Sequence, residues 1–355
     1  MGIISKQPST FNFRNLQFSR KFRFIFYLVI SITTITTVAG QTINFGSTGL
    51  VGESIDNPTS LEFGPDGKLY VSQQNGTIWQ FTVERDLAAP GSGTYSITNS
   101  SQINLIKTGT PNHNDDGSNN TNTTRQITGI LTAGTAANPI LYVTSSDSRI
   151  GGGGGAGNDT NLDTNSGVLS RLTWNGSNWT KVDLVRGLPR CEENHSTNGM
   201  DSFVKNGNTY ILIQQGGNTN MGAPSNNFAG SSEFYLAGAM LIINVTQLEQ
   251  MEVANGGPYT DSRQGNTAYI YDLPTINDPQ KIDITNTHPN FPYKSGHPLY
   301  TATIDLGDPF GGNNGLNQAF SEPGGPVQIF SPGYRNAYDV VIAPNGNIYS
   351  GDNGP

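Results

Sequence analysis

The chain is 355 residues long, with 13% charged residues, 44 glycines and 20 prolines. This composition is typical of many short strands joined by turns, so we expect an all-β protein in which helix is a minor element. The formal net charge of −8 argues against nucleic acid as a partner, because phosphate binding needs clustered Lys and Arg side chains.

The N-terminal segment has the layout of a signal peptide. Five Lys or Arg and no acidic residue occur in the first 23 positions, an apolar run follows over 24–35, and Val38-Ala39-Gly40 supplies small residues at which a signal peptidase cuts. We therefore expect residues 1–40 to be removed and a secreted domain, 41–355, to remain in the periplasm or at the cell surface without stable membrane insertion. An uncleaved anchor is the alternative, although the run is shorter than the about 20 residues that a span needs.

A strand unit repeats along the mature chain. Residues 60–81 alternate apolar and polar side chains and are interrupted by turn residues at Pro65-Asp66-Gly67 and Asn75-Gly76, which predicts three antiparallel strands. Related units surround Tyr142, Tyr210 and Tyr349. The pattern predicts a β-propeller of four-stranded antiparallel blades, about four of them in this chain, with long loops over about 256–325. Thr246–Glu252 is the one segment with helical character.

His195 is the strongest candidate for chemistry. It lies in the polar segment 187–200, which leads into a predicted strand, so a neutral imidazole there could take a proton from a substrate hydroxyl. The alternative is a loop histidine whose hydrogen bonds are satisfied locally. Cys191 is the single cysteine, which excludes an intrachain disulfide, and no helix start or dedicated base beside it supports a thiol nucleophile.

Arg335 and Asn336 form a second candidate set, just before another predicted strand. A planar guanidinium suits a quinone oxygen or a carboxylate, and a structural arginine bonded to loop carbonyls is the alternative. Oxygen-rich loops that begin at His113 and Asp308 could bind calcium, but neither has EF-hand spacing, so solvated loops are the favoured interpretation.

The order of these segments resembles the soluble, pyrroloquinoline quinone-dependent glucose/sorbosone dehydrogenase family. The resemblance rests on a Pro-Asp-Gly-Lys-Leu-Tyr-Val unit, then Gly-Leu-Pro…Asn-His…Asn-Gly-Met, then Gly-Tyr-Arg-Asn-Ala-Tyr-Asp and a final Asp-Asn-Gly-Pro, and it extends from about Asn57 to Pro355. It implies a six-bladed propeller of which this chain holds roughly the first two-thirds, with closure by sequence after Pro355.

The resemblance also implies roles for individual residues. His195 would act as general base on the sugar C1 hydroxyl while hydride passes to the quinone. Arg335 would lie against the quinone oxygens, Asn336 would face the cofactor, and the carbonyl oxygens of Gly354 and Pro355 would bind a calcium ion. A guanidinium and a cation both stabilise negative charge that builds on a quinone oxygen. The implied function is a quinoprotein sugar dehydrogenase that acts on CH-OH groups, with a sugar substrate and an external electron acceptor.

The sequence departs from that family at three points. Asn194 stands where an aspartate often precedes the histidine, Gln126 matches the substrate-side glutamine only if a residue is inserted, and the basic residues that clamp the quinone carboxylates would follow Pro355. Loss of the aspartate favours a second hypothesis, a non-catalytic exported propeller that binds carbohydrate or a protein partner. A calcium-dependent propeller hydrolase such as a lactonase is a third, for which no clear set of metal-binding carboxylates is evident.

Overall fold

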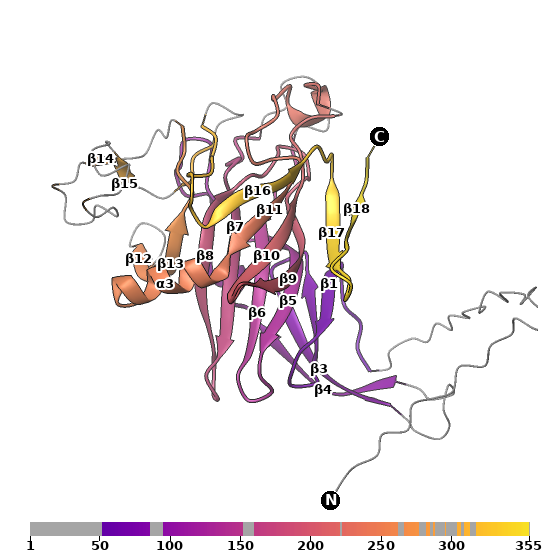
Figure 1. Ribbon diagram of the computed structural model, residues 1–355. Helices are drawn as coiled ribbons and strands as arrows, with labels where there is room; N and C mark the ends of the chain where they lie inside the picture. The colour runs from indigo at the N-terminus through magenta and orange to yellow at the C-terminus, as the bar shows by residue number, and fades with distance from the viewer. Residues whose placement is uncertain are drawn as a thin grey trace, which may run out of the picture. The chain divides into compact units, whose positions relative to one another are not determined.

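The computed structural model describes residues 52–85, 95–151, 160–220, 222–261, 266–276, 309–312 and 317–354, with the backbone of 282–284 and 304–306 and the single positions 287 and 295. All of them belong to the unit Gly49–Pro355, and the predicted signal peptide lies outside them. They are mostly β-strand, which confirms the all-β prediction (Figure 1). No helix in this part of the chain has the length and hydropathy of a membrane-crossing segment.

The first sheet contains the three strands predicted from the alternation in 60–81. Its members pair antiparallel in chain order: β1 (Pro58–Phe63), β2 (Leu69–Gln73), β3 (Ile78–Arg85) and β4 (Tyr95–Ile103). Gly67 completes the turn between β1 and β2 at a φ of 76°, a conformation that favours glycine. Tyr70, Ile78 and Phe81 are fully buried, and such burial stabilises the fold by about 1.5–3 kcal/mol for a large apolar side chain.

The second sheet has six strands in the order β12-β13-β8-β7-β6-β5. They are β5 (Arg125–Gly134), β6 (Pro139–Asp147), β7 (Gly167–Trp174), β8 (Trp179–Leu188), β12 (Tyr259–Asp261) and β13 (Thr267–Asp272), and α2 (Leu105–Gly109) precedes them. β13 pairs with β8 in parallel. Arg186 of β8 donates from Nε and Nη2 to Asp272 at 2.6 and 2.7 Å, and its guanidinium lies 3.8 Å from the ring centroid of Tyr269. The predicted loop region 256–325 therefore contains two strands, β12 and β13, which extend this sheet.

The third sheet has the order β16-β11-β10-β9. Its strands are β9 (Thr197–Lys205), β10 (Asn208–Gln215), β11 (Ala239–Asn244) and β16 (Val327–Pro332). α3 (Val245–Asn255) follows β11 and contains the predicted helical segment, and Asn244 Oδ1 caps its start by accepting from Gln247 N at 3.0 Å. The remaining elements are a 3-10 turn, η2 (Asn226–Phe228), and two antiparallel strand pairs, β14 (Ile282–Ile284) with β15 (Ile304–Leu306) and β17 (Ala337–Ile342) with β18 (Ile348–Asp352).

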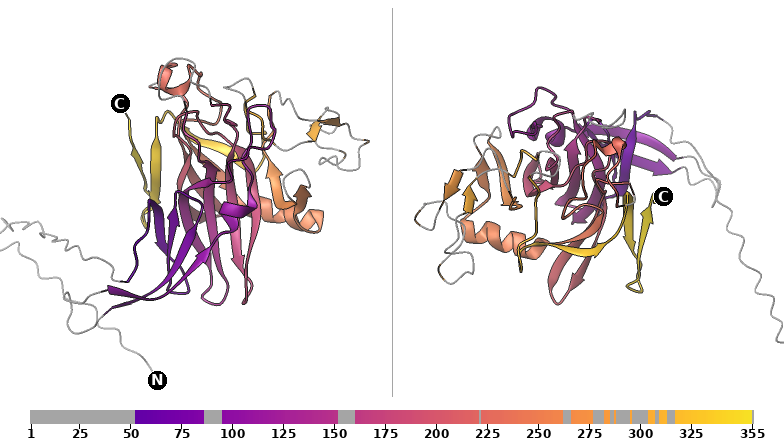
Figure 2. Two further views of the ribbon diagram at one scale, coloured as in Figure 1. Left: turned by 180° about the vertical axis from the view of Figure 1, so that it is seen from behind. Right: turned by 90° about the horizontal axis from the view of Figure 1, so that it is seen from above.

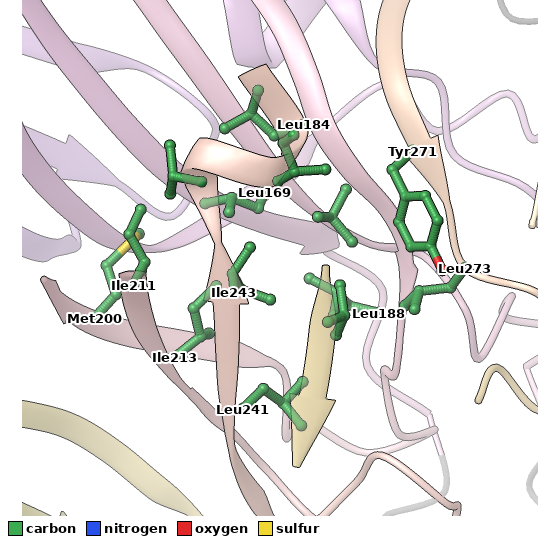
Figure 3. Packing of buried hydrophobic residues seen from close by; sticks show 14 of the residues in the cluster. Leu169, Leu184, Leu188, Met200, Ile211, Ile213, Leu241, Ile243, Tyr271 and Leu273 are labelled. Carbon is green, nitrogen blue, oxygen red and sulfur yellow. The ribbon is translucent and has the colours of Figure 1, made fainter. Parts of the chain in front are cut away.

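The largest hydrophobic core lies between the second and third sheets. Its fully buried members, several of which are labelled in Figure 3, include Leu169, Leu184, Leu188, Ile211, Ile213, Leu241 and Ile243. Buried Leu188 is the last residue of β8, and Met200 of β9 belongs to the same cluster. The core therefore fixes the end of β8 against β9, and the loop between these strands carries His195.

One strand from each sheet lies beside a strand of the next: β1 beside β5, β5 beside β9, and β9 beside β17, as can be followed in Figure 2. Hydrogen bonds join these neighbours, from Ile130 N to Ser60 Oγ at 3.3 Å, from Thr128 Oγ1 to Thr197 O, and from Ile342 N to Asp201 Oδ2 at 2.6 Å. Two sheets have the four antiparallel strands of a blade, but the second has six, one of them parallel, and the sheets are not closed into a ring. The β-propeller is thus not established by this arrangement.

Candidate functional site

His195 is held in a tight turn between β8 and β9. Cys191 N donates to His195 O at 3.1 Å, and His195 N donates to Cys191 Sγ at 3.0 Å. The fully buried Arg190 adds a hydrogen bond from Nη1 to His195 O at 3.2 Å. Burial raises the pKa of the Cys191 thiol to about 11, so this group serves the turn as a hydrogen-bond acceptor and does not ionise as a nucleophile would at neutral pH.

The imidazole of His195 has a defined tautomer. Nδ1 lies 2.8 Å from Gly217 O, and because a carbonyl oxygen can only accept, Nδ1 carries the proton and Nε2 keeps a lone pair. No hydrogen bond to Nε2 occurs within the described part of the chain. Burial, together with the positive charges of Arg335 and Arg190, lowers the pKa of His195 from 6.5 to about 4, although the Gly217 carbonyl acts in the opposite direction. The ring is therefore neutral at physiological pH and able to accept a proton at Nε2.

Arg335 and Asn336 lie in the loop between β16 and β17, which Asp352 at the end of β18 holds in shape. The Asp352 carboxylate accepts from Arg335 N at 3.2 Å and from Asn336 N at 2.9 Å. The Arg335 guanidinium is half-buried and donates from Nε to Asn220 Oδ1 and from Nη1 to Asn353 O, both at 3.0 Å. Since a guanidinium has five N–H donors, three remain for another partner.

Gly216 and Gly217, in the loop after β10, contact both the His195 turn and the loop that carries Arg335 and Asn336. Gly217 O accepts from the His195 ring, and Gly217 N donates to Arg335 O at 2.7 Å. A Cβ atom added to Gly216 would lie 2.7 Å from His195 Cβ and 3.3 Å from Asn336 Oδ1. The structure therefore joins three residues predicted from separate parts of the sequence, His195, Arg335 and Asn336, across the loop after β10.

Of the two predicted calcium ligands, Gly354 and Pro355, the structure describes only Gly354. Gly354 is exposed and follows Asn353, whose carbonyl binds Arg335, whereas Pro355 lies outside the described residues. No group of three or more His, Cys, Asp or Glu side chains arranged to hold a metal ion occurs among the described residues. A carbonyl at Gly354 is a ligand type that calcium accepts, but by itself it makes only a fraction of a shell of six to eight oxygens.

The loop at His113 is not the solvated loop that we expected. His113 is fully buried and stacks on Phe310, with ring centroids 4.3 Å apart. Asp163, also fully buried, approaches the same ring at 3.9 Å between Oδ2 and Nδ1. The loop that begins at His113 therefore contacts the second oxygen-rich loop through Phe310. Asp308, His288 and His297 lie outside the described residues.

A hollow of about 310 Å³ extends along the strands that begin at the candidate site. Thr128 of β5, Gly199 of β9 and Asp339 of β17 line it, together with Leu61 and Tyr338. Tyr338 also donates from its hydroxyl to Thr59 O at 3.1 Å, which joins β17 to β1. The hollow lies beyond His195 and Asn336 along β9 and β17, and these two residues are not part of its lining.

Several site residues could not be found from the sequence. Gly217, Asn218 and Asn220 lie in a Gly- and Asn-rich loop that resembles any other turn region, and Asp352 was expected only as part of a terminal motif. Hydrogen bonds between separate loops, which no spacing in the sequence encodes, join Gly217 to His195, and Asn220 and Asp352 to Arg335.

No protein-family model matches the chain, and no curated protein matches it. Solved structures with some likeness include the calcium structure of a Trichoderma reesei enzyme of carbohydrate-active enzyme family AA12, at 15% identity and a TM-score of 0.29, covering 56% of this chain and 38% of that one. Another is a Thermus thermophilus protein described as an oxidoreductase (glucose dehydrogenase), at 14% identity and a TM-score of 0.30, covering 85% of this chain and 92% of that one. The chain thus spans 38% of the length of the AA12 enzyme. Likeness at these TM-scores carries no conclusion about fold or activity.

Proposed function

We propose that this protein is an exported, quinone-dependent sugar dehydrogenase in which His195 is the general base. The observation that carries the proposal is the constellation at the start of β9 and β17. A neutral imidazole with an open Nε2 lies among residues that also hold a half-buried guanidinium and an amide, Arg335 and Asn336. Oxidation of a C1 hydroxyl requires a group that removes the hydroxyl proton and groups that stabilise negative charge on the acceptor, and this set supplies both.

In the proposed reaction the sugar O–H bond breaks and its proton moves to Nε2 of His195. The Nδ1–H group keeps its hydrogen bond to the Gly217 carbonyl oxygen, and this bond fixes the plane of the ring. A pKa of about 4 makes His195 a weak base in the ligand-free protein. An anion bound at Arg335 would offset one of the positive charges that lower this pKa, so we expect the ring to become more basic when the site is filled.

Pyrroloquinoline quinone and calcium are the cofactors that this proposal requires. Arg335 would hold a quinone oxygen or carboxylate through its remaining N–H groups, Asn336 would add an amide, and Gly354 with Pro355 would offer carbonyl oxygens to calcium. When bound, the quinone would accept the hydride from the sugar carbon, and an external acceptor would reoxidise it. The donor set of Arg335 and Asn336 fits such an anion, because both backbones are fixed by Asp352 while the side chains keep unused donors.

The fold in this proposal is a β-propeller, in which the sheets are blades and β1, β5, β9 and β17 are the strands nearest the axis. Support comes from the succession of these four strands and from the two sheets with four antiparallel strands. In propellers the loops at one end of the inner strands form the ligand site. The candidate residues lie just before β9 and β17, as this geometry requires.

A second function, carbohydrate binding without oxidation, is favoured by one feature. The partner of His195 Nδ1 is a carbonyl and not a carboxylate, so among the described residues no acid accepts from the ring to stabilise an imidazolium. Such a module would use the same loops to bind sugar and would need neither quinone nor calcium.

The two functions are separated by a quinone titration followed by a sugar oxidation assay. Purified protein with calcium is titrated with pyrroloquinoline quinone by absorbance, and dye-linked oxidation of aldoses is then measured. We expect stoichiometric binding, and a loss of about 10²- to 10⁴-fold in kcat for His195→Gln with quinone affinity retained. Asn194→Gln, which changes the exposed neighbour, is the matched control and should behave as the wild type. A protein that binds sugar but no quinone would replace the proposal with the binding module.

A further inference from the structure

The imidazole of His195 is covered in the structure. The residue is 3% exposed, and Phe228 packs on its ring with the ring centroids 4.9 Å apart and the ring planes tilted by 53°. A base takes a proton only from a hydroxyl within hydrogen-bond reach, about 2.6–3.2 Å between heavy atoms. Part of this cover therefore has to move before a substrate hydroxyl can reach the ring.

Much of the cover is fixed by buried hydrogen bonds. Cys191 and His195 bond each other through both backbone N–H groups of their turn, and the fully buried Arg190 also donates to His195 O. On the opposite side, Gly217 is bonded both to the His195 ring and to Arg335 O. Opening at either place would break several buried hydrogen bonds at once, and each broken bond leaves polar groups unpaired.

The η2 segment, residues 222–231, is attached more weakly. It lies between β10 and β11 and forms the coil at the top of Figure 1. Its hydrogen bonds are mostly internal, such as that from Phe228 N to Ser225 O at 3.1 Å. Among the described residues, only Asn220 forms hydrogen bonds with this segment from outside, through the backbone of Ala223. A surface segment with so few outside bonds is of the kind that opens locally while the rest of the chain stays folded.

Phe228 attaches the η2 segment to the site. Its side chain is 2% exposed, yet it belongs to none of the hydrophobic clusters that the described residues form. The ring packs instead on the imidazole of His195. Burial of this one large apolar side chain therefore favours the closed position of the segment.

Two hydroxyl groups of the η2 segment oppose the closed position. The Oγ atoms of Ser225 and Ser231 are buried and have no hydrogen-bond partner. Ser225 precedes η2, but its side chain does not cap the turn. Ala229, next to Phe228, is held at a φ of 56°, in the left-handed region that costs a residue with a Cβ atom. Water would satisfy both hydroxyls if the segment moved outward, so the free energies of the closed and open positions should lie close together.

We propose that the η2 segment is a lid over His195, that Phe228 is the side chain that closes it, and that substrate meets the imidazole only while the lid is open. The burial of His195, the contact with Phe228 and the unpaired hydroxyls of the segment carry this proposal. Lids of this kind keep water from a site between turnovers and admit substrate by a local motion. The inference rests on the proposed role of His195 as a base and adds the conformational step that precedes proton transfer.

Labelling with diethyl pyrocarbonate measures how often the lid opens. The reagent acylates a neutral imidazole nitrogen, and Nε2 of His195 can react once it is uncovered, because Nδ1 is engaged by Gly217 O. The fully buried His113 of the same molecule reports the opening of the rest of the fold. At pH 7 we expect His195 to be acylated about 100-fold faster than His113, as measured by peptide mass spectrometry. Equal rates would overturn the proposal, because both rings would then become accessible only when the whole domain opens.

Two variants should change the labelling of His195 in opposite directions. Phe228→Ala removes the buried ring that holds the lid closed and should speed acylation about 100-fold. Ser225→Ala removes an unpaired hydroxyl from the closed position alone and should slow acylation about 10-fold. The matched controls are Phe81→Ala, a fully buried phenyl group of the first sheet, and Ser202→Ala, an exposed serine of β9. Neither control should change the rate at His195, although Phe81→Ala should lower the melting temperature.

The outcomes separate the lid from the proposed function, because labelling needs neither sugar nor quinone. If oxidation requires His195 while Phe228→Ala and Ser225→Ala are labelled as the controls are, the lid is refuted alone. If labelling responds as expected but no sugar is oxidised, the lid stands and the dehydrogenase is refuted. Where oxidation occurs, Ser225→Ala should lower kcat/KM by the factor by which it slows labelling. An unchanged kcat/KM would overturn the proposal, because substrate would then reach the imidazole by another route.

Discussion

Gly216→Ala is the change that most directly tests the geometry at His195. The added methyl carbon would lie 2.7 Å from His195 Cβ, closer than two non-bonded carbon atoms normally approach, and 3.3 Å from His195 Cα, a tight contact. Cβ and Cα cannot move aside by a change of rotamer, so the backbone of the loop has to shift. Overpacking of this kind costs about 1–3 kcal/mol. The same shift would move the imidazole relative to Asn336, whose Oδ1 faces the new methyl at 3.3 Å.

The effect of Gly216→Ala can be measured by calorimetry and by the sugar oxidation assay. For a domain of this size about 1–3 kcal/mol corresponds to a melting temperature lower by roughly 2–10 °C. A displaced base should also reduce kcat about 10- to 100-fold. The control is Gly351→Ala in β18, where an added Cβ meets nothing within 4 Å. Equal melting temperatures and activities for the two variants would refute the close approach of the β10 loop to His195.

Three further predictions concern the same turn and its neighbours. Because the pKa of His195 is about 4 in the folded chain and 6.5 otherwise, the unfolded chain binds more protons between these values. Stability should therefore rise with pH from 4 to 6.5, by at most about 1.4 kcal/mol per pH unit, and urea titrations of His195→Gln should lack this rise. Cys191 should resist iodoacetamide at pH 8 until denaturant is added, since burial raises the pKa of its thiol to about 11; labelling of the native protein would contradict the buried turn. Asp352→Ala should weaken quinone binding about tenfold in an absorbance titration, because two backbone N–H groups that shape the Arg335 loop lose their acceptor; an unchanged affinity would show that this loop needs no such anchor.

The strands were predictable where alternation and turn residues coincide. The pattern around Pro65-Asp66-Gly67 predicted β1 to β3, because the period of side-chain alternation and the φ of a turn glycine are local properties. The parallel pairing of β13 with β8 was not predictable. The pairing brings Arg186 and Asp272, which are 86 residues apart in the chain, into contact, and no local signal in either segment reports the other.

The candidate site was predictable in its main members and not in its construction. His195, Arg335 and Asn336 stood out as polar residues at the start of strands, and the structure brings them together. The sequence argued against a nucleophilic role for Cys191, but its role as an acceptor within the turn could not be inferred, because the hydrogen bond from His195 N depends on the conformation of the loop. Likewise His113 was expected in solvent, whereas its stacking on Phe310 depends on a loop far away in the chain.

The extension of the second sheet by β13 has a consequence for how the chain folds. β5 to β8 pair with their sequence neighbours, so they can form early at little entropic cost. β13 can join only after β8 exists, and the loop it closes is long, so its docking is expected to be a late event. Until then Arg186, 1% exposed in the finished structure, would remain hydrated. During refolding, strands β5 to β8 should therefore pair in a faster kinetic phase, and the environment of Tyr269 in β13 should change in a slower phase, when β13 docks on β8.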